Sequence, residues 1–179
     1  ALSYNEDGSS YCFACAKFTP PEDTGGSVSN INERVVPGQG FNKAAFAEPY
    51  KGYHERGLTA TTMAAYSAQQ KAGNVLFGYH SQDGELVACK TRTEDKNFSI
   101  SGDWKKAGLY GQHMFPSGGQ YITVVEGEFD ALAGYQMFGG KYPVVSIRNG
   151  AQGAAADCRR AYEFLDQYDH IIFCFDNDD

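Results

Sequence analysis

Acidic side chains gather at the ends of two apolar stretches of the chain. The first stretch reads ITVV and runs into Glu126, with Glu128 and Asp130 just after it; the second reads HIIFCF and runs into Asp176 and Asp178. Carboxylates that crowd a partly dry cleft repel one another, and they stay ionised when a divalent cation lies among them. Oxygen ligands of this kind favour Mg²⁺ or Mn²⁺. The pattern therefore predicts a metal-dependent active site.

Each of these acids also has a simpler interpretation. Asp130 is suited to cap the amino end of a helix, and Glu128 is suited to a solvated turn. Taken without Glu126, the pair Asp176 and Asp178 is compatible with an ordinary acidic loop. We favour the metal site because the acids occur at two strand ends of one predicted sheet.

Three strands and two helices must position these acids. The apolar runs at residues 122–125, 143–147 and 170–175 predict strands that are covered on both faces. Apolar residues at helical spacing predict helices over residues 129–138 and 154–167. This β-α-β-α-β order with short connections predicts a parallel sheet, and the carboxyl ends of its strands form the edge at which ligands bind.

The segment before these strands shows a different pattern. Helical spacing predicts a helix over residues 59–73, with Thr59 as its N-cap. Asp83-Gly84 separates two β-rich runs within residues 75–92 and predicts a β-hairpin, and KNFSISG adds a further strand. The predicted fold class is therefore α/β, with an α+β amino-terminal subdomain that carries a β-hairpin, followed by the parallel sheet.

Composition narrows the class of protein. The 179 residues carry a net charge of −7, which argues against a general nucleic-acid binder, although acids gathered for a metal lower this sum without excluding a basic groove. No run of about 18 apolar residues occurs, so the sequence predicts no membrane-spanning helix. Five scattered cysteines do not form a disulfide framework, which favours a reducing, cytoplasmic setting.

A basic cluster lies in the amino-terminal half. Its five basic residues outnumber the three acids among them: Lys90, Arg92, Lys96, Lys105 and Lys106 against Glu94, Asp95 and Asp103. Such a cluster suits nucleotide phosphates or a template strand, and it equally suits a solvated strand face. The nearby Phe98, Trp104 and Tyr110 are more typical of a core than of a base-stacking platform. Arg148 and Asn149, after the second predicted strand, are weaker candidates for nucleotide contact.

The two acidic motifs resemble the Toprim domain, which DnaG-type primases, topoisomerases and some nucleases share. VVEGEFDALA is similar to the motif with the Toprim glutamate, and FCFDNDD, about 50 residues later, to the Asp-x-Asp motif. YCFACAKF, RGLTATTM, VACKTRTEDKNF, LYGQHMF and KYPVVSIRNGA occur in an order that closely resembles the primase half of short-tailed-phage DNA primase–helicases. The mitochondrial helicase Twinkle is a more distant relative, and the resemblance covers nearly the whole chain.

The resemblance implies a DNA primase, a nucleotidyltransferase that makes short RNA primers from ribonucleotides during phage DNA replication. It implies four partners: single-stranded DNA template, ribonucleoside triphosphates, a helicase domain of the same intact chain and a replicative DNA polymerase. It also implies a phage protein that works in the cytoplasm of its bacterial host. No G-x-x-x-x-G-K-[ST] motif occurs, so this chain holds no helicase ATP site.

Roles for single residues also follow from the resemblance. The implied Mg²⁺ ligands are Glu126, Asp130, Asp176 and Asp178. The implied catalytic residues are Glu126, which would help to activate the attacking 3′-hydroxyl or hold metal, together with Asp176 and Asp178. The implied nucleotide-binding or DNA-binding residues are Lys90, Arg92 and Lys96.

Cys12 and Cys15 form a C-x-x-C pair. A structural zinc site needs four ligands, no second pair occurs nearby, and no strand precedes the pair as a redox motif would require. The resemblance implies that the pair is the second half of a zinc ribbon, so we expect both cysteines to ligate Zn²⁺ in the intact protein. The expected domains are half a zinc ribbon (1–18), a flexible linker (19–45), an amino-terminal primase subdomain (46–118) and a truncated Toprim domain (119–179).

Two other functions stay open at this point. One is a Toprim nuclease with the same metal chemistry, against which the C-x-x-C pair and CKTRTEDKNF both argue. The other is a non-catalytic nucleic-acid-binding module, against which Glu126, Asp176 and Asp178 argue. We expect the chain to be a fragment of a longer protein, and such a fragment can lack activity by itself.

Overall fold

The computed structural model describes residues 2–4, 10–12, 17–19, 41–47 and 49–177. The chain divides into two compact units, Ala1–Asn32 and Glu33–Asp179. In the first unit, a three-stranded antiparallel sheet consists of β1 (Leu2–Tyr4), β2 (Ser10–Cys12) and β3 (Lys17–Thr19). Cys15, Asp178 and most of the predicted linker lie outside the described residues. The domain boundaries given above stay predictions.

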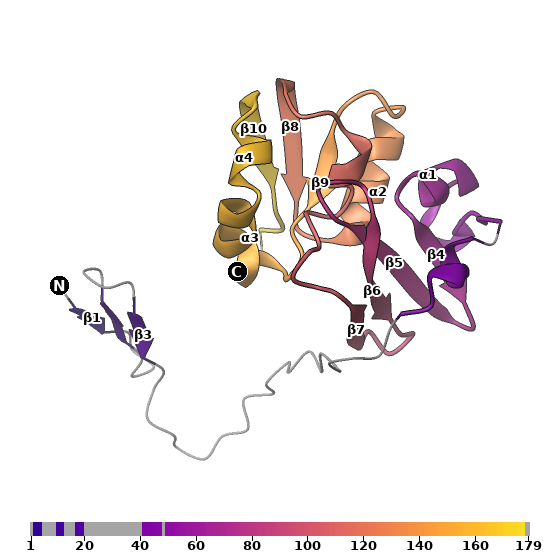
Figure 1. The fold of residues 1–179 in the computed structure, drawn as a ribbon, viewed down its shortest axis with the longest axis horizontal. Coiled ribbons are helices and arrows are strands. Elements are labelled where there is room, and N and C mark those ends of the chain that lie inside the picture. Colours follow the sequence, from indigo (N-terminus) through magenta and orange to yellow (C-terminus); the bar gives the residue numbers. More distant parts are fainter. Residues whose placement is uncertain (1, 5–9, 13–16, 20–40, 48, 178–179) are drawn as a thin grey trace, which may run out of the picture. The chain divides into compact units, whose positions relative to one another are not determined.

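The described residues of the second unit form two sheets and four short α-helices (Figure 1). The antiparallel sheet has the order β4-β5-β6-β7, with β4 (Ala68–Lys71), β5 (Asn74–His80), β6 (Leu86–Arg92) and β7 (Phe98–Gly102). The parallel sheet has the order β10-β8-β9, with β8 (Gly119–Val125), β9 (Val144–Ser146) and β10 (Tyr168–Cys174). The α-helices are α1 (Ala60–Ala65), α2 (Glu128–Met137), α3 (Ala154–Arg160) and α4 (Tyr162–Leu165). Short 3₁₀ helices occupy Lys43–Phe46, His54–Arg56, Gln112–Met114 and Ala151–Gly153. None of the described helices is long and apolar enough to cross a membrane.

The predicted hairpin and the predicted parallel order are both confirmed. β5 and β6 pair antiparallel, and the turn between them closes when the Ser81 backbone N–H donates to the Glu85 oxygen at 2.8 Å. Gly84 in this turn has a φ of +81°, a left-handed conformation that glycine adopts without a steric cost. β8, α2, β9, α3 with α4, and β10 follow one another as the sequence pattern predicts, and the strands pair in parallel.

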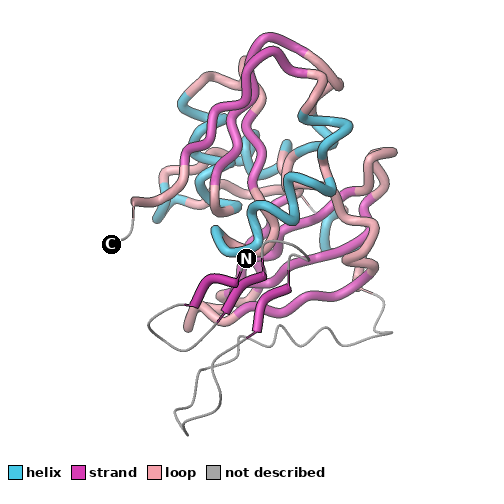
Figure 2. Tube along the Cα trace, turned by 90° about the vertical axis from the view of Figure 1, so that its left-hand side faces the viewer, coloured by secondary structure: helices cyan, strands magenta, loops and turns pink. Residues whose placement is uncertain are grey.

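Side chains of the parallel sheet alternate between two cores. Ile122, Val124 and Val145 pack in the cluster that α3 and α4 help to form, whereas Val125 and Val144 pack in the cluster shared with α2 and the antiparallel sheet. Helices flank this sheet in Figures 1 and 2. Burial of each such aliphatic side chain stabilises the fold by about 1.5–3 kcal/mol. One core therefore joins the two sheets, and it fixes the position of α2 against both.

The prediction that β10 is covered on both faces is wrong. β8 lies at the centre of the sheet and β10 at its edge, where Ile171, Ile172 and Phe173 are 37%, 47% and 55% exposed. The strand exists and pairs as expected, but the order of strands along the chain does not determine which strand is central.

The prediction of a helix over residues 59–73 is correct only for its first half. Thr59 caps α1 by accepting a hydrogen bond from the Thr62 backbone N–H at 3.2 Å. The helix ends at Ala65, Ser67 takes a φ of +51°, and the chain continues as β4. Pairing with β5 and full burial of Ala68 outweigh the helix propensity of this segment, which is a weak local preference.

Candidate active site at the carboxyl edge of the parallel sheet

Glu126 and Asp176 reach the same edge because β8 and β10 are neighbouring parallel strands. Val125 and Cys174 are paired in register, so the chain leaves the sheet side by side after these two residues. Glu126 follows Val125 directly, and Asp176 comes two residues after Cys174. Asp178, the fourth predicted ligand, lies outside the described residues.

Asp130 joins these two acids from the first turn of α2. Its carboxylate accepts a hydrogen bond from the Gly127 backbone N–H at 3.0 Å, which is the helix-capping role that the sequence offered. Partial burial raises the pKa of Asp130, and the negative charges of Asp176 and Glu126 raise it further against the opposing effect of the Gly127 hydrogen bond. Asp130 therefore both caps the helix and lies close enough to the other two carboxylates to be influenced by their charge.

No cation neutralises this group of acids within the described part of the chain. Glu126, Asp130 and Asp176 form none of its ion pairs, and Glu126 Oε1 accepts only a long hydrogen bond from the Ala151 N–H at 3.4 Å. Carboxylate oxygens are the donors that Mg²⁺ prefers, so the chemistry of these side chains fits the ion. Among the described residues, which do not include Asp178, no three His, Cys, Asp or Glu side chains are grouped so that they could hold a metal ion.

Glu128 has a different environment from its neighbours in the sequence. The solvated-turn interpretation of Glu128 is wrong, since the residue is only 6% exposed. Its Oε1 lies 2.9 Å from Lys90 Nζ and accepts a hydrogen bond from the Tyr79 hydroxyl at 2.6 Å. Burial and the neighbouring Glu128 charge raise the pKa of Tyr79, so this hydroxyl stays a donor. The ion pair ties the amino end of α2 to β6, and the Tyr79 hydrogen bond ties it to β5.

Lys90, predicted to bind nucleotide, is 7% exposed and makes two polar contacts inside the protein. Besides pairing with Glu128, its ammonium donates to the Arg148 backbone oxygen at 2.8 Å. Lys90 therefore links α2 to the segment that follows β9. The predicted nucleotide contact stays a prediction, and it would require the ammonium to leave Glu128.

The Arg148 side chain is also buried, and its polar contacts are with other parts of the protein. Its guanidinium lies 2.8 Å from Asp157 Oδ1, and its backbone N–H donates to Asp157 Oδ2 at 2.7 Å. The same guanidinium donates to the backbone oxygens of Trp104 and Ala107 at 3.1 and 3.2 Å. Because every arm of this side chain has a partner, Arg148 holds the segment after β9 in place, and that segment delivers the Ala151 N–H to Glu126.

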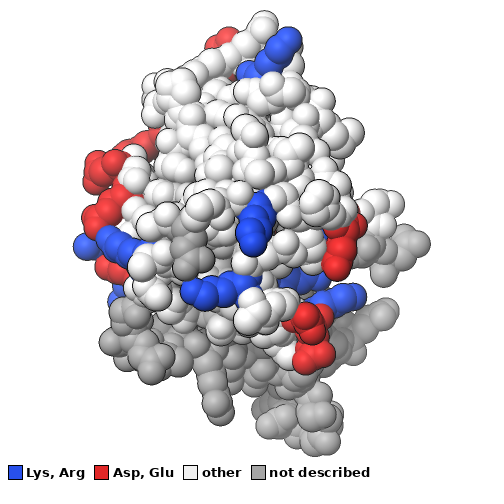
Figure 3. Space-filling model, turned by 90° about the vertical axis from the view of Figure 1, so that its right-hand side faces the viewer, with Lys and Arg blue, Asp and Glu red and all other residues white. Residues whose placement is uncertain are grey.

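Other predicted cations lie beside α2. A cavity of about 350 Å³ is lined by Arg92, Lys96, Arg56 and Phe129, among others. The Arg56 guanidinium lies 4.0 Å and that of Arg92 5.3 Å from the centroid of the Phe129 ring. Phe129 directly precedes Asp130, so these cations and the acids are positioned by the same turn of α2. Figure 3 shows basic side chains in a band across one face of the molecule, with acidic ones on both flanks.

The aromatic residues near the basic cluster differ in their burial. Tyr110 is fully buried, which confirms its predicted core position, and Trp104 packs against the same cluster. Phe98 is 39% exposed, so its predicted core position is wrong, and the ammonium of Lys90 lies 4.9 Å from its ring centroid. Within the first unit, Cys12 ends β2, while Cys15 lies outside the described residues, so the zinc half-site stays a prediction.

Three residues that matter at this site were missed by the sequence analysis: Arg56, Tyr79 and Asp157. Arg56 lies far from the basic cluster in sequence, in a 3₁₀ turn that brings it to Phe129. Tyr79 and Asp157 lie in a strand and a helix whose patterns predict a core or a solvated face. No local signal marks them, because each acquires its role from a partner that is 9 or more residues away.

Comparison with known proteins gives a consistent set of relatives, although no family model matches the chain. The primase fragment of the bacteriophage T7 primase–helicase is 32% identical, with a TM-score of 0.69 over 99% of this chain and 75% of that one. A second T7 structure, with a TM-score of 0.66 and the same identity and coverage, contains primase domains of two subunits bound to an RNA/DNA hybrid and dTTP and interacting with the lagging-strand DNA polymerase. The DNA helicase/primase of Enterobacteria phage T3 is 32% identical over 99% of this chain. The chain spans 33% of the length of that curated relative.

The fold and these relatives define a Toprim-type primase domain. The catalytic core of the Escherichia coli primase shares this fold, with a TM-score of 0.52 and 15% identity over 70% of this chain and 54% of that one. The closer identities to the phage T7 and T3 proteins go further: the chain belongs to the family formed by the primase part of bacteriophage primase–helicases.

Proposed function

We propose that this chain is the catalytic part of a DNA primase that joins ribonucleotides into short RNA primers on single-stranded DNA. The observation that carries the proposal is that Glu126 and Asp176 follow paired ends of parallel strands at the carboxyl edge of the sheet, where their charges raise the pKa of Asp130 and none of the three acids forms an ion pair among the described residues. The T7 primase domains are bound to an RNA/DNA hybrid and dTTP, and a hybrid of this kind is the product that the proposal expects of this chain.

Primer extension is a nucleotidyl transfer. The 3′-hydroxyl oxygen of the growing primer attacks the α-phosphorus of the next ribonucleotide, the bond between the α- and β-phosphates breaks, and pyrophosphate leaves. Glu126 is the group that accepts or orients the hydroxyl proton, while Asp130, Asp176 and Asp178 would hold Mg²⁺. When bound, Mg²⁺ supplies charge neutralisation at the reacting phosphate oxygens.

Cations of the amino-terminal subdomain serve the polyphosphate in this proposal. Arg92 and Lys96 line the cavity beside Phe129 together with Arg56, and cations placed near a transferring phosphate stabilise the charge that develops there. Lys90 is held by Glu128. Its direct role would follow only from a rearrangement that frees the ammonium, so we propose that Lys90 acts mainly by positioning α2.

For the whole protein we propose further parts by analogy with the relatives. The T3 relative is named a helicase/primase, so a helicase domain is proposed for the same intact chain. A Zn²⁺ site that includes Cys12 and Cys15, a replicative polymerase partner and action in the cytoplasm of a bacterial host complete the proposal. The T7 primase domains that interact with a DNA polymerase support the polymerase as a partner.

The test is a primer-synthesis assay on single-stranded DNA with Mg²⁺ and labelled ribonucleotides. We expect short oligoribonucleotides from the parent protein and none from the Asp176→Asn variant. Asp169→Asn is the matched control, because Asp169 is an exposed acid in β10, the strand that precedes Asp176, and its substitution should leave the product unchanged. Nicked DNA without ribonucleotide incorporation would replace the primase proposal with a nuclease, and equal activity of all three proteins would remove the acidic edge from the mechanism.

A further inference from the structure

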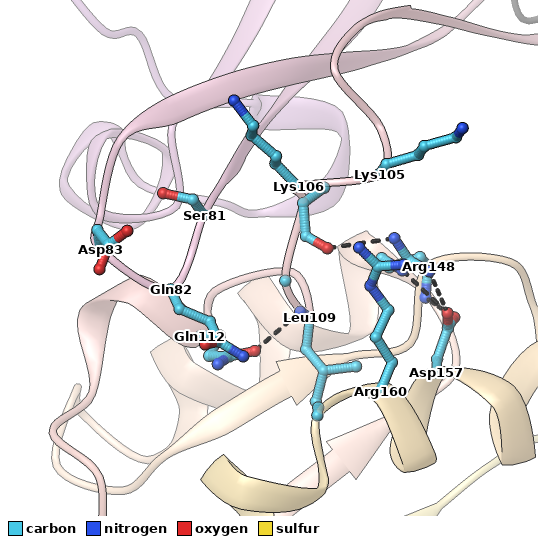
Figure 4. A pocket seen from close by; sticks show the side chains of 13 residues that line it. Ser81, Gln82, Asp83, Lys105, Lys106, Leu109, Gln112, Arg148, Asp157 and Arg160 are labelled. Carbon is cyan, nitrogen blue, oxygen red and sulfur yellow. Dashed lines mark hydrogen bonds and ion pairs between the residues drawn. The ribbon is translucent and has the colours of Figure 1, made fainter.

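A second basic cavity lies apart from the acidic edge. It has a volume of about 300 Å³ and is enclosed by the β5–β6 turn, the loop around Lys105 and Lys106, and α3. Figure 4 shows Arg160 reaching from α3 toward Arg148 and the loop that carries Lys106. None of the described acids of the candidate active site lines this cavity. We call it the α3 pocket.

The α3 pocket is locally positive although the whole chain is negative. Four cationic side chains line it, Lys105, Lys106, Arg148 and Arg160, against two acids, Asp83 and Asp157. Asp157 is already paired with Arg148, so the Arg148–Asp157 pair forms a neutral, rigid wall. Three cations and one acid remain to determine the charge that a ligand meets.

The remaining cations are largely free to bind. Arg160 is exposed and, like Lys105, forms no ion pair or hydrogen bond within the part of the chain that the structure describes. Lys106 lies 3.6 Å from Asp103 in a pair whose side chains are 69% and 48% exposed, and exposed pairs of this kind contribute about 0–1 kcal/mol. A phosphate could therefore displace Asp103 from Lys106 at little cost.

The lining also shows which chemistry the pocket would recognise. No aromatic side chain lines it, so it offers no platform on which a nucleobase could stack. The Leu109 backbone N–H donates to Gln112 Oε1 at 3.0 Å (Figure 4). This contact fixes the amide, and its NH₂ group points elsewhere as a donor. Cations and amide donors without aromatic rings suit phosphate oxygens rather than bases.

We propose that the α3 pocket binds backbone phosphates of the single-stranded template, with Arg160 and Lys106 as the contacting side chains. This inference rests on the proposed primase function and adds a template contact outside the acidic edge. Arg148 connects the two places, because it forms one wall of the pocket and begins the segment that ends at the Ala151 N–H on Glu126. A strand held in the pocket is thus held beside the segment that supports the acids.

The experiment compares two adjacent arginines on one helix. Arg159 and Arg160 are both exposed in the last turn of α3, but only Arg160 lines the pocket. Binding of a fluorescent oligothymidylate is measured by anisotropy over a series of salt concentrations, with the parent protein, Arg159→Gln and Arg160→Gln. We expect Arg160→Gln to weaken binding about threefold and to reduce the slope of log K against log salt by about 0.7, the value for one phosphate contact on a single strand. Arg159→Gln should match the parent, and Lys106→Gln should match Arg160→Gln.

Two outcomes would overturn the proposal. Equal effects of Arg159→Gln and Arg160→Gln would mean that the helix contributes only diffuse charge. Weaker competition by ATP with unchanged oligonucleotide binding in Arg160→Gln would mean that the pocket binds a free nucleotide. Failure of the primase proposal would be seen in a different assay, the comparison of primer synthesis by the parent and by Asp176→Asn. In that assay, Arg160→Gln should raise the KM for template and retain kcat.

Discussion

Two charged regions meet at the first turn of α2, and they are built in opposite ways. Glu126, Asp130 and Asp176 lie at the edge of the parallel sheet with no cation among the described residues. Glu128, between the first two in sequence, is buried against Lys90. β8 ends at Val125 and α2 begins at Glu128. This short connection places the Glu128 carboxylate inside the protein and leaves those of Glu126 and Asp130 at the edge of the sheet.

The difference between the paired Glu128 and the unpaired edge acids indicates that the first serves stability and the others serve catalysis. A buried carboxylate needs a partner, and Glu128 has both Lys90 and the Tyr79 hydroxyl. Carboxylates that repel one another at an edge cost stability in the absence of a cation, so their presence there favours function over folding. A Glu-to-Gln substitution should therefore lower activity but not stability at Glu126, whereas at Glu128 it should lower stability.

The largest effect is expected on activity at the open region. Glu126→Gln removes the group that handles the 3′-hydroxyl proton, and loss of a general base lowers rates by about 10²–10⁴-fold. The thermal unfolding midpoint should not fall, because Glu126 forms no ion pair among the described residues and its charge repels that of Asp130. Primer synthesis and a thermal melt on the same sample measure both quantities. A variant that melts earlier than its parent would contradict the comparison.

The next effect is expected on stability at the closed region. Glu128→Gln leaves the Lys90 ammonium buried without its counter-charge, and breaking a buried pair destabilises a protein by about 3–5 kcal/mol. Urea unfolding measures this loss. Lys90→Met together with Glu128→Met should recover part of it, since apolar residues of similar volume remove the unpaired charge. Strictly additive effects of the two single substitutions would show that the pair is not coupled.

Much of this arrangement could be predicted from the sequence, because the decisive signals are local. Short apolar runs that end in acids predict β8, β10 and the shared edge, and Asp83-Gly84 predicts the hairpin. The edge position of β10 could not be predicted, since strand order depends on which strands pair.

The partners of single charged side chains were the harder part. Lys90 and Arg92 alternate along one strand with the same spacing as a solvated basic face, yet Lys90 is buried and Arg92 is not. What distinguishes them is Glu128, which is 38 residues away in the chain and meets Lys90 only after α2 packs on the antiparallel sheet. Periodicity predicts the elements, whereas pairs between elements depend on packing.

Two stacked histidines, His80 and His113, show a third way in which the fold accommodates ionisable groups. Unlike the Lys90–Glu128 ion pair and the unpaired acids at the sheet edge, these two side chains are held in their neutral form. The rings of His80 and His113 lie with centroids 3.6 Å apart, and His80 Nδ1 is buried without a hydrogen-bond partner among the described residues. The pKa of each falls from 6.5 to about 4, mainly because the ring is buried, and for His80 the charge of His113 is a second cause.

The smallest predicted effect is therefore a loss of stability in mild acid. Between about pH 6.5 and pH 4 the unfolded chain binds protons that the folded protein does not bind, so the free energy of unfolding falls as the pH falls through this window. Solvent reaches part of both rings, which keeps the change to about 1 kcal/mol. Urea unfolding of the parent, of His113→Phe and of His170→Phe across this window measures it, because each variant keeps a stacked ring. The His113→Phe variant should lose part of the pH dependence and His170→Phe, on the exposed edge strand, should keep it. The same pH dependence in all three proteins would assign the acid sensitivity to the carboxylates instead of to the histidine pair.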